Sequence, residues 1–333
     1  MMKPGRIAAV HVPLLVITGC SGIQSALQPE GREAVELHGL LLASTGFSAA
    51  ITLLVLALII VAMWGPRSWR HRLAHEWLIF GGGIILPVVL LTCLLVYGLV
   101  TMDAGASRAA RAEGPGITIV GKRWWWQVVY TSTDGERVVS ANELRLPVGR
   151  PVTLRLESDN VIHSFWAPKL AGKLDMIPGR TNTLTVEAIE PSISRGQCAE
   201  YCGGAHALMS FYVVAMPAQD FDAWLEAEAG PASDPQNTAA RRGSQLFQEN
   251  GCGGCHTIRG TEATGTIGPD LTHVGSRHSL AAATLPNDAQ AFSRWITNNQ
   301  HIKPDNLMPV YQYLKPEEVE AISVYLEGLD LGD

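Results

Sequence analysis

The hydrophobicity pattern is dominated by two long apolar segments near the N-terminus. The first runs from His38 to Trp64, the second from Trp77 to Met102, and neither contains a formally charged residue. About 20 apolar residues are enough for a helix to cross a bilayer. The pattern therefore predicts a two-helix transmembrane hairpin with spans at about residues 39–64 and 77–101.

Positive charge lies between these two segments. The connecting sequence carries Arg67, Arg70 and Arg72. Short loops rich in arginine and lysine stay on the cytoplasmic side of the membrane. We therefore expect both ends of the hairpin, and everything that follows it, on the outer face.

The first residues have the pattern of an export signal. "MMKPGR" gives a basic start, and "IAAVHVPLLVITG" gives an apolar stretch too short to span a bilayer. The stretch ends in "ITGC", which resembles the lipobox of bacterial lipoproteins. This predicts a signal peptide at 1–19 and lipidation of Cys20, with an uncleaved or conventionally cleaved export signal as the alternative.

Beyond Met102 the pattern changes to short alternating segments. "PVTLRLES" and "TNTLTVEA" alternate apolar and polar residues, and Gly, Pro and Asn separate such segments. Regularly spaced short strands indicate an antiparallel sandwich or barrel. We predict an exported all-β domain over about 117–216, closed by a short helix in "AQDFDAWLEAEA".

Composition narrows the function classes. A chain of 333 residues has room for two or three domains. Its formal net charge of -6 argues against nucleic-acid binding, which needs basic patches, and is weakly compatible with a basic protein partner. Six cysteines suggest a disulfide framework only until their positions are considered.

Four soft ligands gather near the end of the predicted β domain. The segment "CAEYCGGAHALM" contains Cys198, Cys202, His206 and Met209. Structural zinc has no use for methionine, and a disulfide would leave the histidine and methionine unexplained. Thiolate, imidazole and thioether together suit copper. Two thiolates can bridge two coppers, in which case a second imidazole is needed, and His163 in "NVIHSFWAPKL" is the candidate.

These segments together resemble the dinuclear copper centre (CuA) of cytochrome c oxidase subunit II, and "DMIPGR" adds to the likeness. The resemblance implies a cupredoxin-like Greek-key barrel in which Cys198 and Cys202 bridge both coppers. It also implies that His163 and Met209 complete one copper site. The other would use His206 and the main-chain carbonyl of Glu200.

Two further roles follow from the same resemblance. The Glu200 carboxylate would help to hold magnesium at the boundary with subunit I. "GKRWWWQVVY" is similar to the aromatic patch that precedes the barrel in this family, which makes Trp124 the candidate residue through which electrons enter at the surface. The alternative is that these tryptophans pack the barrel against the membrane subunit.

A second redox motif follows a linker-like stretch. Cys252-Gly-Gly-Cys255-His256 is the attachment motif of c-type haem, in which both thiols bind the haem and the histidine ligates iron. A thioredoxin-like pair is disfavoured by the adjacent histidine and the export signal. "IKPDNLMPVY" resembles class I cytochromes c in offering Met308 as the second iron ligand. His–Met ligation raises the potential and suits electron transfer.

The expected architecture is a multidomain membrane protein that combines the helical hairpin, the all-β cupredoxin-like domain and an all-α class I cytochrome c domain. The transmembrane hairpin region occupies 20–103, and the copper domain occupies 113–229. The linker occupies 230–240, and the cytochrome domain 241–333.

The whole chain thus resembles subunit II of a caa-type haem-copper oxidase with a fused cytochrome c domain. The resemblance implies electron transfer from an external donor, either cytochrome c or a quinol-oxidising complex, through haem c and CuA to subunit I. There, with the other oxidase subunits, oxygen is reduced to water with proton pumping. It also implies a multi-pass protein of the bacterial inner membrane with copper and haem domains on the periplasmic face.

Two other functions remain open at this point. A copper-containing nitric oxide reductase could use a similar electron-transfer subunit. A copper-delivery or copper-sensing lipoprotein would bind metal without passing electrons, and the fused haem motif argues against it.

Overall fold

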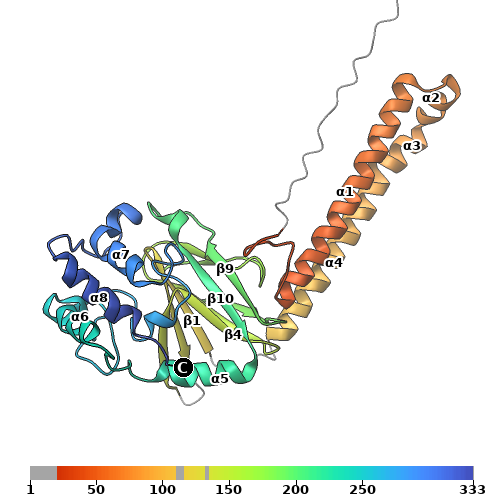
Figure 1. Ribbon diagram of the computed structural model, residues 1–333. Coiled ribbons are helices and arrows are strands. Elements are labelled where there is room, and N and C mark those ends of the chain that lie inside the picture. The colour runs from red at the N-terminus through yellow and green to blue at the C-terminus, as the bar shows by residue number, and fades with distance from the viewer. Residues whose placement is uncertain (1–20, 110–115, 132–134, 333) are drawn as a thin grey trace, which may run out of the picture.

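The computed structural model describes residues 21–109, 116–131 and 135–332. A long helical hairpin projects from a β domain, and a helical domain covers the opposite end of that domain (Figure 1). The predicted signal peptide at 1–19 and the predicted lipidation site, Cys20, lie outside the described residues.

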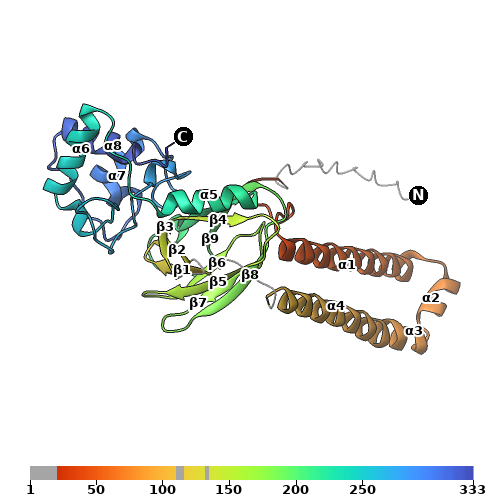
Figure 2. The same ribbon diagram turned by 90° about the horizontal axis from the view of Figure 1, so that it is seen from below.

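The hairpin is dominated by two long apolar helices whose side chains are exposed on the surface of the protein. Segments Arg32–Trp64 and Glu76–Met102 are long and apolar enough to cross a membrane, and none of the residues in their most apolar windows is buried in the protein. The two long helices run side by side in Figure 2. Their elements are α1 (Arg32–Trp64), α2 (Arg67–Leu73), α3 (Glu76–Phe80), η1 (Gly81–Ile85) and α4 (Leu86–Ala109).

The three consecutive glycines of the second segment change the helix locally. Gly81–Ile85 forms a π-helical turn between α3 and α4. Glycine has no Cβ to restrict its backbone dihedral angles, so the main chain can adopt this local change of hydrogen-bond pattern; such turns are usually short insertions in α-helices.

The β domain has two five-stranded sheets packed face to face (Figure 2). Their facing side chains form a core that includes Trp126, Tyr130 and Phe165, all fully buried. One sheet has the order β3-β2-β1-β5-β8 and the other the order β4-β10-β9-β6-β7. The strands are β1 (Gly116–Lys122), β2 (Trp125–Thr131), β3 (Arg137–Ala141), β4 (Glu143–Pro147), β5 (Val152–Ser158), β6 (His163–Trp166), β7 (Leu174–Met176), β8 (Asn182–Val186), β9 (Ser192–Cys198) and β10 (Ser210–Met216).

The expectation of purely antiparallel pairing is wrong at two places. β1 pairs in parallel with β5, with Ile117 opposite Leu154, and β10 pairs in parallel with β4. The chain passes from one sheet to the other at β4 and returns at β5. Because of these crossings, neighbours in a sheet are distant in sequence and can run in the same direction. The predicted closing helix is present as α5 (Ala218–Ala229).

The C-terminal domain is built on three helices that pack around a separate apolar core. Asn237 and Asp288 cap two of them, each accepting a hydrogen bond from a main-chain N–H in the first turn. Gly243 lets two helices touch, because a Cβ there would lie 2.0 Å from the Ala321 carbonyl oxygen. The elements are α6 (Thr238–Glu249), η3 (Cys252–Gly254), η4 (Val274–Ser276), α7 (Ala289–Ile302) and α8 (Pro316–Glu327).

A buried carboxylate joins the β domain to the C-terminal domain. Glu143 is 4% exposed and pairs with Arg145 at 2.6 Å. Its second oxygen accepts hydrogen bonds from the main-chain N–H and the ring Nδ1 of His278, both at 2.9 Å. Arg145 also donates to the Ser276 carbonyl at 3.2 Å. The two domains therefore meet through a fully partnered buried charge.

Two further contacts fix the same interface. The guanidinium of Arg259 donates to Val139 O, to Glu228 O and to Asp270. The left-handed stretch Ala281–Ala283, with φ between 53° and 61°, also contacts the β domain through its main-chain carbonyls. The main-chain N–H of Ser210 donates to Ala282 O at 3.3 Å. Both domains thus supply main-chain and side-chain partners.

Two histidines of the C-terminal domain lie against residues from distant parts of the sequence. His273 is 4% exposed, with Nε2 3.2 Å from the Gly230 carbonyl. His278 is bound to Glu143 as described. Both lie near the domain interface, where a partner from a distant part of the sequence covers them.

Removing the Glu143 charge should loosen the interface. Burial opposes ionisation of this carboxyl, but hydrogen bonds from His278 and the charge of Arg145 outweigh it. They hold its pKa at about 2, below its ordinary value of 4.5. We expect Glu143→Gln to weaken domain docking by about 2 kcal/mol. The measurement is the rate of proteolysis in the connecting segment 231–237 of the full chain.

The pH dependence has a definite sign. Because the pKa is lowered in the docked form, the stabilisation is complete above pH 4.5 and is lost as pH falls toward 2. Asp222→Asn is the matched control, since Asp222 pairs with Arg150 on the exposed surface. Equal cleavage rates for the two variants would contradict the role of Glu143.

Candidate functional site

The predicted copper ligands come from three parts of the β domain. His163 begins β6, Cys198 ends β9, and Met209 directly precedes β10. β6 and β9 are paired with Phe165 opposite Cys198, so the histidine and the first cysteine meet at one end of the sheet. The turn between β9 and β10 carries Cys202 and His206 back over that end.

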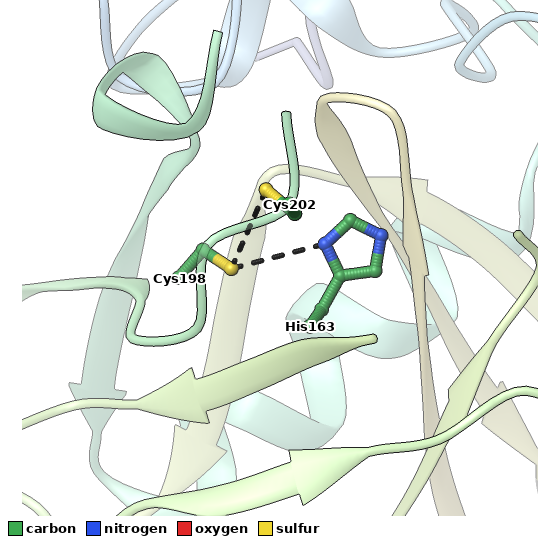
Figure 3. Close-up of side chains that lie close together, drawn as sticks. All are labelled: His163, Cys198 and Cys202. Atoms are coloured by element: carbon green, nitrogen blue, oxygen red, sulfur yellow. Dashed lines mark hydrogen bonds between the residues drawn. The ribbon is translucent and has the colours of Figure 1, made fainter. Parts of the chain in front are cut away.

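The donor atoms converge. Figure 3 shows the Cys198 thiol facing both Cys202 and the His163 ring. Cys198 Sγ lies 3.8 Å from His163 Nδ1 and 3.8 Å from Cys202 Sγ. Cys202 Sγ lies 3.5 Å from His206 Nδ1 and 3.8 Å from Met209 Sδ. The ligand atoms of His163, Cys198 and Cys202 all lie within 4.8 Å of one another.

The sixth predicted ligand is also in place. The main-chain carbonyl oxygen of Glu200 lies 3.2 Å from Cys198 Sγ. The Glu200 side chain is half-buried. The structure thus brings all six predicted copper-site residues together, three around each thiol when the partner thiol is included.

The donor set fits copper. The two sulfurs are too far apart for a disulfide, whose S–S length is about 2.05 Å. A hydrogen bond from Cys202 lowers the pKa of Cys198 to about 3, and the same bond raises the pKa of Cys202. Thiolate, imidazole and thioether ligands favour copper over hard cations.

The site is dry and its histidine is held in place. His163 and Met209 are fully buried, and the two thiols are less than 5% exposed. His163 Nε2 lies 3.2 Å from the Asn160 side-chain oxygen, which leaves Nδ1 directed at the thiols. Gly121 lies against the ring, since a Cβ there would be 2.7 Å from His163 Cδ2.

The predicted haem ligands surround one large cavity. Cys252, Cys255, His256 and Met308 all line it. The side chains around them are mainly apolar and include Phe292, Ile296 and Leu326. Covalent attachment, two axial ligands and an apolar shell are what a c-type haem requires.

The proximal histidine is oriented by its neighbours. His256 Nδ1 lies 2.7 Å from the Pro269 carbonyl, to which it can donate, leaving Nε2 free for iron. Burial lowers the pKa of His256 and favours the neutral ring that can ligate metal. A Cβ on Gly268 would lie 2.5 Å from His256 Cε1, so glycine is required at this contact.

Two buried cations also line this cavity. Arg277 is 9% exposed, and its Nε has no hydrogen-bond partner among the described residues. Lys303 is 3% exposed. A haem carries two carboxylates, so an unpartnered guanidinium nitrogen in the wall fits that group.

Trp124 lies between the two sites. It lines the haem cavity, and its indole N–H donates to the Cys202 carbonyl at 3.0 Å. Trp124 is only 4% exposed when both domains are present, so the expectation that it lies at the protein surface is wrong. The C-terminal domain covers the face that would otherwise be open.

Sequence reasoning missed the charged residues at the domain interface and in the haem cavity. Burial of a charge depends on partners from distant segments and leaves no local pattern. Lys303 and Arg259 had one usable signal, since they stand five residues before Met308 and three residues after His256. The residues missed are Glu143, Arg145, Arg259, Arg277 and Lys303.

The chain matches two known families in separate regions. Residues 132–216 match the family "Cytochrome C oxidase subunit II, periplasmic domain". Residues 240–330 match the family "Cytochrome c". The first match covers most of the β domain, including all six copper-site residues, and the second covers the haem motif and Met308.

One of the similar proteins matches nearly the whole chain, and others match parts of it. "Cytochrome c oxidase subunit 2" of Alkalihalophilus pseudofirmus is 33% identical, covering 98% of this chain and 99% of its own. The protein of that name from Bacillus subtilis is 30% identical, covering 74% of this chain and 72% of its own. The solved periplasmic domain of subunit II of cytochrome oxidase (CoxB) of Bradyrhizobium japonicum aligns with 35% of this chain and 96% of its own, at 27% identity and a TM-score of 0.33.

A methyl group at Gly121 should damage the copper site. The Cβ of Gly121→Ala would push against the fully buried His163 ring, which has no room to move. We expect copper affinity to fall by about 10–100-fold. Competition with a copper chelator on the full chain measures this. Gly116→Ala, at an open position of the same strand, is the control, and equal affinities would refute the contact.

A methyl group at Gly268 should disturb haem ligation. Crowding of the His256 ring costs about 1–3 kcal/mol, or about 5- to 150-fold in the ligation equilibrium. We expect Gly268→Ala to lose low-spin, six-coordinate haem in optical spectra. Gly254→Ala serves for comparison, since a Cβ at Gly254 meets open space. An unchanged Gly268→Ala spectrum would argue against this contact.

Proposed function

The chain belongs to the family of cytochrome c oxidase subunits II that carry a C-terminal cytochrome c domain, and we propose that it is the electron-transfer subunit of a respiratory terminal oxidase. Electrons would pass from a donor into this chain and on to subunit I. Oxygen would be reduced to water there, with proton translocation by the complex.

One observation carries the proposal. The converged copper ligands and the haem cavity lie on either side of one residue, Trp124, which lines the cavity and hydrogen-bonds to Cys202 O. A metal-binding module without electron throughput has no need for this arrangement. Trp124 is the proposed residue through which electrons enter the copper domain, here from the covered side.

The proposed copper ligands act in two sets. Cys198 and Cys202 hold both coppers, His163 and Met209 complete one, and His206 with Glu200 O completes the other. The distances from the two thiols to these atoms, between 3.2 and 3.8 Å, support the ligand set. The Glu200 carboxylate is proposed to help hold magnesium at the subunit I boundary.

The proposed haem ligands are the four residues already located in the cavity wall. Cys252 and Cys255 attach haem c, and His256 and Met308 ligate its iron. When bound, the haem and the copper centre supply reversible one-electron chemistry. The chain's own residues fix the ligands, exclude water and set the charge around them.

The proposed membrane arrangement follows from the hairpin. Two unburied apolar helices support anchoring in the bacterial inner membrane. The arginines of α2 support the proposal that the turn lies in the cytoplasm and the copper and haem domains on the periplasmic face. A signal peptide at 1–19 and lipidation of Cys20 remain proposals from the sequence.

The proposed domain limits are 20–103, 113–229, 230–240 and 241–333. α5 ends at Ala229 and α6 begins at Thr238, which supports the linker. The proposed partners are subunit I and the other oxidase subunits, with cytochrome c or a quinol-oxidising complex as donor. The relatives described above are named as oxidase subunits, and nothing in them favours a nitric oxide reductase.

Metal content and magnetic resonance test the proposal. The full chain, matured with haem and loaded with copper in detergent, should contain two coppers per haem iron. Its electron paramagnetic resonance spectrum should show hyperfine splitting from two equivalent coppers. A single-copper signal, or zinc in place of copper, would overturn the dinuclear site and leave a membrane-anchored cytochrome c.

A further inference from the structure

Lys303 is a buried cation without an anionic partner in the described part of the chain. It caps the C-terminus of α7 and is 3% exposed. Its ammonium donates to the Ala281 carbonyl at 3.1 Å, and the described residues form no ion pair with it. Transferring an ammonium out of water costs several kcal/mol unless an anion compensates it. A single carbonyl oxygen compensates this cost much less than an anion would.

The position of Lys303 is fixed from two sides. The Ala281 carbonyl belongs to the left-handed stretch Ala281–Ala283, whose next carbonyl is bound by Ser210 of the copper domain. On its own side, the main-chain N–H of Lys303 donates to Asn299 O at 2.8 Å. The lysine cannot easily turn toward solvent, so its charge stays in the cavity wall.

Two redox sites lie within reach of this charge. Lys303 lines the haem cavity together with Arg277 and Trp124. It also borders the copper site, because the carbonyl next to its Ala281 partner accepts a hydrogen bond from Ser210, the residue after Met209. Asp305, two residues on, packs against the copper turn, since a Cβ on Gly204 would lie 2.8 Å from its carboxylate.

We propose that Lys303 pairs with a carboxylate of haem c and that its single charge raises the reduction potential of both the haem and the copper centre. The inference rests on the proposed function. A carboxylate from the haem is the anion that the cavity would supply, and it would offset the cost of burying the ammonium. Lys303 is a positioning residue: it holds the haem's edge and biases both centres toward the reduced state.

The pKa of Lys303 is consistent with an ammonium group that lacks a neighbouring anion in the chain alone. Burial lowers the pKa of Lys303 to about 7 in the chain alone, against an ordinary value of 10.5. A carboxylate beside the ammonium would raise this pKa again.

The test compares three variants of the full chain in detergent, matured with haem and loaded with copper. Lys303→Gln removes the charge, Lys303→Arg keeps it, and Arg294→Gln removes a cation from the exposed face of the same helix. Spectroelectrochemistry gives the midpoint potential of each centre. Haem and copper contents are measured on every sample.

We expect Lys303→Gln to lower the equilibrium constant for haem reduction by about tenfold, which is 59 mV for a one-electron couple. The copper centre should shift in the same direction. Lys303→Arg should restore both potentials to within about threefold of the unsubstituted chain, and Arg294→Gln should leave both unchanged.

Equal haem potentials for Lys303→Gln and Arg294→Gln would overturn the inference. If Lys303→Gln takes up no haem, its copper potential is still measured, and an unshifted value would also overturn it. An unsubstituted chain without covalent haem would contradict the proposed function instead, so the two failures are distinguishable.

Discussion

The contact between Glu143 and His278 is the constraint on which the rest of the arrangement depends. It joins β4 to the segment after η4, and both of its hydrogen bonds to His278 measure 2.9 Å. Because the Glu143 carboxylate is buried and paired with Arg145, it stays ionised and its hydrogen bonds keep a fixed geometry. The haem cavity has walls from both domains. Without this contact the wall that carries Trp124 would be held less firmly against the C-terminal domain.

Fusion of the two domains changes which face of the copper domain is exposed to solvent. In a chain without the C-terminal domain, the face bearing Trp124 would be open to a diffusing partner. Here it is covered, and Trp124 Nε1 and the copper turn lie beneath the cavity that would hold the haem. A tethered donor works at a high effective concentration, so transfer need not wait for a diffusional encounter.

Local sequence predicted those features whose chemistry lies within one segment. Cys252–His256 and Cys198–Met209 each gather most of their proposed ligands in a few residues, so the spacing itself indicates the site, while His163 and Met308 come from distant segments. The parallel pair of β1 with β5 left no such signal, because it depends on how the chain crosses between sheets. The same holds for His278 and Lys303: each lies in a segment that reads as surface loop until a distant partner buries it.

The left-handed stretch Ala281–Ala283 has a consequence for cooperativity. Each non-glycine residue in this conformation costs roughly 1–2 kcal/mol. Part of that cost is offset from outside the C-terminal domain, by Ser210 N–H and by Arg195, which donates to Ala283 O at 3.2 Å. The β domain thereby stabilises part of the backbone of the C-terminal domain. We therefore expect the two domains to unfold as a linked unit, and a severed C-terminal domain to be less stable than its own core suggests.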